Sequence, residues 1–299
     1  MDRLNKLLKL YYKAHAFKML REKTQTDYIY FLSVANLTLK DTKLNKLTPV
    51  DANRYYQEWL NKGVSFANHV ATCVSTVLNW GIQLGYIQSN PFSNIKRVTA
   101  TKRTDIWTKE DVKKVLDYAY TDFNSRNIGL IIQMAYEFCQ RVGDMRTLKW
   151  ENFNDDMSVL YLQQSKRRAK VELPVYEELQ KMLIEQRKDF GFQQYVAPNI
   201  KPVGGEYEPY TLYNLSKKGR LLMNNAGVSK SIRLMDLRRT GIMEMVDGGV
   251  SLPQIMSVSG HANPQSVKPY MKNTFDSANN ALTMRKNSIE SAMKQQEGV

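Results

Sequence analysis

Two patterns of hydrophobic and polar positions divide the chain. Over residues 4–86 the apolar side chains recur at intervals of three and four, which is the spacing of an amphipathic helix. One such run contains Tyr28, Phe31, Leu32 and Ala35. Turn and capping signals such as Thr48-Pro49 separate the runs. The N-terminal half is therefore predicted to be entirely helical.

The pattern becomes mixed after residue 105. Thr108 and Asp111 form a capping signal directly before an apolar run, and a second helix is predicted over residues 128–140. Two runs rich in β-branched and apolar residues, 159–163 and 171–175, flank a charged segment and predict an antiparallel hairpin. Further helices are predicted over residues 177–187, 210–225 and 235–246. The predicted fold class is mainly α with a small antiparallel β-sheet.

The residues around position 100 contain few apolar side chains and many Lys, Arg and Thr. A segment of this composition between two helical regions is typical of an interdomain linker. We therefore expect a helical domain over 1–94, a linker over 95–105, a mixed α+β domain over 106–277 and a polar tail over 278–299.

Charge narrows the possible partners. The chain has 43 Lys+Arg against 29 Asp+Glu, a formal net charge of +14. An excess of this size predicts a polyanionic partner, and its division into separate clusters favours nucleic acid over a membrane surface. The clusters are Lys96, Arg97, Lys102 and Arg103; Lys166, Arg167, Arg168 and Lys170; Lys217, Lys218 and Arg220; and Lys230, Arg233, Arg238 and Arg239.

Other features of the sequence indicate the cellular compartment and whether a metal or cofactor is bound. No apolar stretch is long enough to span a bilayer, and the N-terminus has charges among its leucines, so a cytoplasmic protein without a membrane partner is expected. Cys73 and Cys139 cannot form a disulfide framework, and three histidines offer no metal-ligand spacing. We expect no metal and no cofactor.

Four local patterns in the second half carry candidate chemistry. They place Arg141 after an apolar helix, Lys166 near a hairpin tip, Arg238 in the first turn of a helix, and His261 nine residues before Tyr270. Each has a simpler explanation alone, such as a solvated charge or a packed ring. A cation in the first turn, however, opposes the helix dipole and indicates a bound anion.

Together and in this order, the patterns resemble the tyrosine recombinase (phage integrase) family. The carrying motifs are CQRVGDMRTLKW (139–150), LYLQQSKRRAKVELPV (160–175), LMDLRRTGIMEMVDGG (234–249) and SVSGHANPQSVKPYM (257–271). The helical half also resembles the family's core-binding domain, including NWGIQLGYIQSNP (79–91) before its linker. The resemblance covers most of the chain and implies a helical core-binding domain joined to an α+β catalytic domain.

The resemblance implies a role for each candidate. Arg141 and Arg238 match the two arginines that contact the phosphate, Lys166 the hairpin lysine that acts as general acid, His261 the histidine of the third motif, and Tyr270 the nucleophile. Guanidiniums suit this role because they are planar and permanently charged. The implied reaction is cofactor-independent cutting and rejoining of double-stranded DNA through a 3′-phosphotyrosine, performed by four protomers on two core sites.

One position departs from the family pattern. Met235 occupies the place where the family usually has a histidine, and a thioether cannot donate a hydrogen bond to phosphate. Three interpretations stay open: an integrase of a phage or other mobile element, which we favour; a Xer-type chromosome-dimer resolvase; and a non-catalytic DNA-binding protein on the same scaffold. For an integrase we expect a bacterial host cell, association with the nucleoid, and accessory DNA-bending or directionality proteins.

Overall fold

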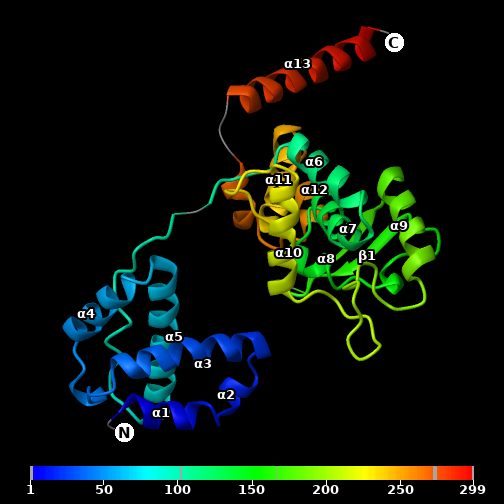
Figure 1. The fold of residues 1–299 in the computed structure, drawn as a ribbon. Coiled ribbons are helices and arrows are strands. Elements are labelled where there is room, and N and C mark those ends of the chain that lie inside the picture. The colour runs from blue at the N-terminus through cyan, green and yellow to red at the C-terminus, as the bar shows by residue number, and fades with distance from the viewer. Residues whose placement is uncertain (1–2, 102, 167, 272–274, 298–299) are drawn as a thin grey trace. The chain divides into compact units, whose positions relative to one another are not determined.

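The computed structural model describes residues 3–101, 103–166, 168–271 and 275–297. The chain forms two compact units, Met1–Arg103 and Thr104–Val299 (Figure 1). Each unit has its own hydrophobic core. Within the described ranges, no helix combines the length and the apolar character that a membrane span requires.

The first unit is built of helices. They are α1 (Leu4–Tyr11), α2 (His15–Lys18), α3 (Glu22–Thr38), the 3-10 helix η1 (Leu44–Lys46), α4 (Pro49–Leu60) and α5 (Val64–Gln83). α4 begins at the predicted signal, since the Thr48 side chain accepts from the backbone N–H of Asp51 and the Asp51 side chain accepts in return. The apolar face of α5 packs against α3 and α4 and forms the centre of this unit's core.

The residues expected to form the linker are attached to this helical unit. The backbone N–H of Val98 donates to the Tyr56 hydroxyl at 2.8 Å, and the Asn68 side chain donates to the Val98 carbonyl at 2.9 Å. Arg97 donates to the Thr72 hydroxyl at 2.7 Å. These bonds satisfy the backbone of an extended segment that lacks a sheet partner. The boundary between the units consequently falls after Arg103.

The second unit confirms the predicted fold class, since its described residues form many helices and a two-stranded antiparallel hairpin (Figure 1). Its elements are α6 (Lys109–Tyr120), α7 (Phe123–Glu137), α8 (Val142–Met145), η2 (Trp150–Asn152), β1 (Val159–Gln163), β2 (Lys170–Pro174), α9 (Glu177–Phe190), α10 (Leu212–Asn225), η3 (Leu234–Asp236), α11 (Leu237–Asp247), α12 (Leu252–Ser259), η4 (Pro264–Ser266), η5 (Lys268–Tyr270) and α13 (Phe275–Glu297). In the hairpin, Leu160 lies opposite Leu173 and Leu162 opposite Val171, and these four side chains face the core.

The structure corrects the predicted end of the helix before Arg141. α7 ends at Glu137 rather than near residue 140, because Cys139 adopts a left-handed conformation with φ of 51°. Arg141 is thereby the N-cap residue of the short helix α8, so it does not lie at the C-terminal end of α7. Burial raises the pKa of the Cys139 thiol to about 12, which makes it a neutral packing group.

The turn at Cys139 requires a glycine on the facing helix. A Cβ on Gly241 of α11 would overlap Sγ of Cys139 and lie 3.2 Å from the Tyr136 carbonyl oxygen. We expect Gly241→Ala to lower the free energy of unfolding by about 2 kcal/mol through overpacking. Adding Cys139→Gly should recover most of the lost free energy of unfolding, because it removes the obstructing sulfur and glycine readily adopts the left-handed conformation.

Urea unfolding of the two single variants and the double variant measures this coupling. Gly143→Ala is the matched control, because its new Cβ would meet only a Leu212 methyl group at 3.7 Å. Strictly additive effects of the substitutions at positions 139 and 241 would contradict the proposed contact.

Candidate active site

Arg238 is the most deeply buried of the predicted site residues. It lies in the first turn of α11 with 8% of its surface exposed. Its Nη1 donates to Gln140 Oε1 at 3.2 Å, and its Nη2 donates to the Ser259 carbonyl at 2.7 Å. Burial lowers the pKa of Arg238 to about 10, and the positive charge of Arg141 is the second cause. The guanidinium is therefore charged at neutral pH although it is removed from water.

Arg141 lies close to Arg238 and is more accessible, with 27% of its side chain exposed. Its Nη1 donates to Gln164 Oε1 at 3.1 Å. Asp144, three residues after Arg141, has Oδ2 at 3.8 Å from the same nitrogen. The other Asp144 oxygen accepts from the backbone N–H of Ser165 at 3.0 Å. Asp144 thus connects the helix that follows Arg141 to the hairpin loop.

His261 completes a group of three cationic or proton-carrying side chains. Its two ring nitrogens lie 3.5 and 3.4 Å from Arg238 Nη2, and Nδ1 lies 2.8 Å from the Ser259 hydroxyl. The chain reaches this position through Gly260, which has φ of 66° at the end of α12. A Cβ on Gly260 would lie 2.6 Å from Gln164 Nε2, so both the conformation and the available space require glycine.

Tyr270 and Lys166 occupy different surroundings. Tyr270 lies on η5, where its ring packs against a small cluster formed by Cys139, Ile242, Ile255 and Val267. Its phenol is close enough to Arg238 to favour the charged form of the guanidinium. Lys166 is exposed on the loop between β1 and β2, and its neighbour Arg167 lies outside the described residues.

The structure therefore brings Arg141, Arg238, His261 and Tyr270 together and leaves Lys166 on the adjoining loop. This arrangement offers positive charge and hydrogen-bond donors to an anion, with a phenol beside them. Across the described ranges, His, Cys, Asp and Glu side chains form no group of three that could hold a metal ion.

Sequence reasoning missed two buried glutamines between the arginines. Gln164 Nε2 donates to Gln140 Oε1 at 2.7 Å and to the Ser259 carbonyl at 2.8 Å. Gln140 Nε2 donates to the carbonyls of Phe138 and Val258 at 3.1 and 2.7 Å. The available signal was local: each glutamine lies within two residues of a predicted site residue, yet each side chain is fully buried.

Trp107 and Thr240 anchor the segment that contains Arg238. The Trp107 backbone N–H donates to the Thr240 hydroxyl at 2.9 Å, and its indole N–H donates to the Arg233 carbonyl at 3.0 Å. Trp107 is 2% exposed and packs in the core of this unit. The threonine of the LRRT motif thus joins α11 to the start of the second unit.

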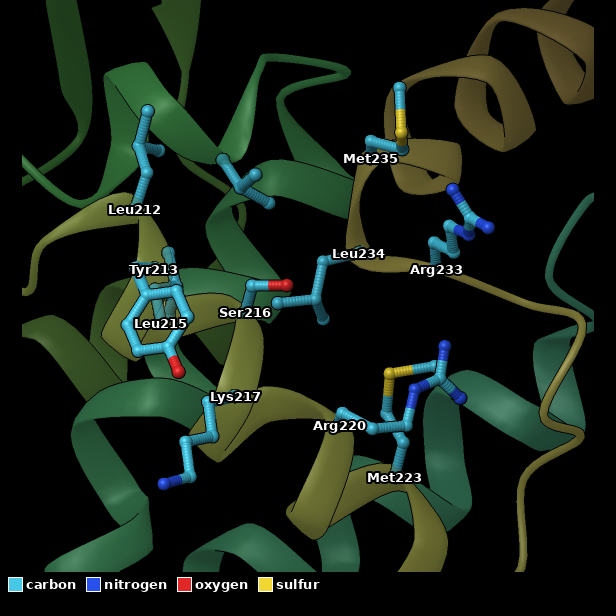
Figure 2. A pocket seen from close by; sticks show the side chains of 11 residues that line it. Leu212, Tyr213, Leu215, Ser216, Lys217, Arg220, Met223, Arg233, Leu234 and Met235 are labelled. Carbon is cyan, nitrogen blue, oxygen red and sulfur yellow. The ribbon is translucent and has the colours of Figure 1, made fainter. Parts of the chain in front are cut away.

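Met235, at the position where the family usually has a histidine, is exposed to solvent. Its side chain is 65% exposed on η3 and lines a hollow of about 680 Å³. Figure 2 shows this hollow between Met235, Leu234 and Arg233 on one side and α10 residues such as Tyr213 and Lys217 on the other. The thioether supplies no donor to an anion held by Arg238.

Comparison with known proteins identifies the family of the chain and its fold. Residues 106–277 match the phage integrase family, and the chain belongs to that family. A lambda integrase dimer bound to a COC′ core site has a TM-score of 0.76 at 19% identity, covering 91% of this chain and 78% of that chain. A lambda integrase tetramer bound to a Holliday junction has a TM-score of 0.76 at 18% identity, again covering 91% and 78%.

A transposon integrase shares the same fold. The Tn1549 integrase in complex with circular intermediate DNA has a TM-score of 0.74 at 14% identity, covering 94% of this chain and 99% of that chain. No curated protein matches the sequence.

Restoring the missing donor at Met235 should accelerate strand cleavage. We expect Met235→His to raise the cleavage rate at saturating DNA by about tenfold or more, because one hydrogen-bond donor to a developing oxyanion is typically worth about 10²–10³ in rate. Single-turnover cleavage of a nicked substrate measures the effect, with Met235→Leu as the apolar control. An unchanged rate in Met235→His would show that Met235 does not limit the chemistry.

Proposed function

We propose that this protein is a site-specific DNA recombinase that integrates the DNA of a phage or other mobile element into a host chromosome. The observation that carries the proposal is the approach of two guanidiniums and an imidazole to one another, with a tyrosine beside them. Family membership supports the reaction class, and the net charge of +14 supports a DNA partner.

The proposed reaction follows from the residue types. The Tyr270 oxygen attacks phosphorus, the bond to the 5′-oxygen breaks, and a 3′-phosphotyrosine forms. Arg141 and Arg238 stabilise the charge on the non-bridging oxygens. His261 assists removal of the phenol proton, and Lys166 protonates the departing 5′-oxygen. Because the new linkage is still a phosphodiester, another 5′-hydroxyl can reverse the step and rejoin the strands.

We further propose an assembly of four protomers on two core sites. The lambda integrase tetramer on a Holliday junction supports this arrangement, since this chain shares its fold. The described side chains of residues 278–290 are all exposed, so α13 is available to dock on a neighbouring protomer. Accessory DNA-bending or directionality proteins and action at the nucleoid in the bacterial cytoplasm belong to the same proposal.

Two other roles compete with integration. A Xer-type resolvase would use the same chemistry on a different target. One specific observation supports a non-catalytic DNA-binding protein. The exposed Met235 stands where the family usually has a histidine that donates to phosphate. A recombinase, whether an integrase or a resolvase, differs from a non-catalytic binding protein in one chemical product, because only a recombinase becomes covalently attached to DNA.

Identification of the covalent linkage tests the proposal. The protein is incubated with nicked fragments of the genome that carries its gene. After cleavage next to a nick, the short released strand diffuses away, so rejoining is prevented and the covalent intermediate accumulates. Protein-linked DNA is recovered after denaturation, and mass spectrometry locates the modified peptide. We expect attachment through a 3′-phosphate at Tyr270, and sequencing the attached DNA would identify the core site. Attachment at another residue would show that Tyr270 is not the nucleophile, and absence of any attachment would favour the binding-only role.

A further inference from the structure

The two arginines of the site are connected by a pair of neutral side chains. Gln164 Oε1 accepts from Arg141, and Gln140 Oε1 accepts from Arg238, at 3.1 and 3.2 Å. The two amides are themselves joined by a 2.7 Å hydrogen bond from Gln164 to Gln140. A continuous path of hydrogen bonds therefore runs from one guanidinium to the other.

The surroundings determine which way each amide points. Gln140 directs Nε2 at two backbone carbonyls, those of Phe138 and Val258, so its oxygen must face the site. Gln164 directs Nε2 at Gln140 and at the carbonyl of Ser259, so its oxygen must face Arg141. Flipping either amide would place its NH₂ group against an arginine and leave carbonyl oxygens without these donors.

The chemical character of the pair matters as much as its geometry. A carboxylate in the same place would accept the same hydrogen bonds but would also neutralise an arginine. An amide orients the guanidinium and leaves its full charge for another anion. Both glutamines are fully buried, so solvent cannot replace them as acceptors.

We propose that Gln140 and Gln164 are positioning residues, which fix the guanidiniums of Arg141 and Arg238 side by side and keep both charges available to one DNA phosphate. This inference rests on the proposed recombinase function. Gln164 also lies two residues before Lys166, and its backbone N–H and carbonyl bond to Ala169 and Arg168 at the other end of the loop. The same residue therefore connects the lysine loop to the arginines.

Gln164→Met in the full chain tests the inference. We expect the cleavage rate at saturating DNA to fall by about 10- to 100-fold, since a displacement of about 1 Å at a reacting centre can cost about 100-fold. The dissociation constant for DNA should stay within about threefold, because phosphate contacts elsewhere dominate affinity. Gln163→Met is the matched control, because Gln163 is exposed at the end of β1, directly before Gln164.

A double-mutant cycle separates positioning from a general structural role. If Gln164 acts through Arg141, adding Gln164→Met to Arg141→Lys should lower the cleavage rate by less than about a further threefold. If the two residues acted independently, the losses of rate in the single variants would multiply. Gln164→Glu has nearly the same shape and should slow cleavage at least as much as Gln164→Met, because its carboxylate would pair with Arg141 and could not donate to Gln140 Oε1 and the Ser259 carbonyl. It also provides the test if Gln164→Met fails to fold.

The possible failures are distinguishable. Wild-type cleavage rates in Gln164→Met or Gln164→Glu, or multiplicative losses in the cycle, would overturn the positioning role alone. Absence of a Tyr270-linked complex in both wild type and Gln163→Met would overturn the proposed function, and the positioning role with it.

Discussion

Replacing Tyr270 with phenylalanine should abolish the covalent protein–DNA complex completely while leaving DNA affinity within about threefold of wild type. The substitution removes only the oxygen that is proposed to attack phosphorus. The ring remains, and with it the packing against Val267 and the rest of its small cluster. Denaturing gel electrophoresis of labelled nicked DNA measures the complex, and fluorescence anisotropy measures affinity.

The control for this prediction is Tyr161→Phe. Tyr161 is 47% exposed on β1, so the same oxygen is lost from a tyrosine outside the candidate site. We expect this variant to form the covalent complex at the wild-type rate. Persistence of the complex in Tyr270→Phe would mean that another side chain is the nucleophile, and the assigned roles of the neighbouring arginines would then need revision.

The second large effect is expected for Arg238→Met, which should lower the cleavage rate by about 10³-fold or more and should not destabilise the protein. The rate falls because a buried guanidinium is worth several kcal/mol to a developing phosphate charge. Stability should rise by about 1 kcal/mol, since replacing a buried ion with an apolar side chain of similar size is often neutral or stabilising. Both acceptors of Arg238, Gln140 Oε1 and the Ser259 carbonyl, keep their bonds from Gln164.

The pKa of Arg238 predicts the pH range of this stability difference. Burial lowers that pKa to about 10 in the folded protein, so the unfolded chain binds the proton more tightly. The charge on Arg238 therefore opposes folding fully below about pH 10, and the penalty decreases as the pH rises above that value. Urea unfolding of wild type and variant between about pH 6 and 9 should show a constant difference.

Arg239→Met is the control, because it removes the same charge at the adjacent, partly exposed position of α11. A loss of more than about 2 kcal/mol in Arg238→Met would contradict the expectation and would indicate that this arginine is needed for folding. The cleavage rate and the free energy of unfolding of Arg238→Met together determine whether this arginine lowers stability while it raises activity.

Much of the fold follows from local pattern. The capping signal at Thr108 and Asp111 marks the start of α6, and the alternating residues of 159–163 form β1 with the predicted ends. The fold class and Arg238 in the first helical turn were also predicted correctly. These features depend on side chains within a few residues of one another, which explains why sequence alone indicates them.

The sequence by itself determined the residue types of the candidate site, their order and the excess of positive charge. Only the tertiary structure decided that α7 ends at Glu137, because the left-handed turn at Cys139 depends on the close approach of Gly241. It alone revealed Gln140 and Gln164 as the link between the arginines, since their bonds join residues 23 to 98 positions apart in the chain. Periodicity reports which face of an element is apolar, whereas an amide hydrogen bond depends on the distance and direction between atoms that only folding brings together.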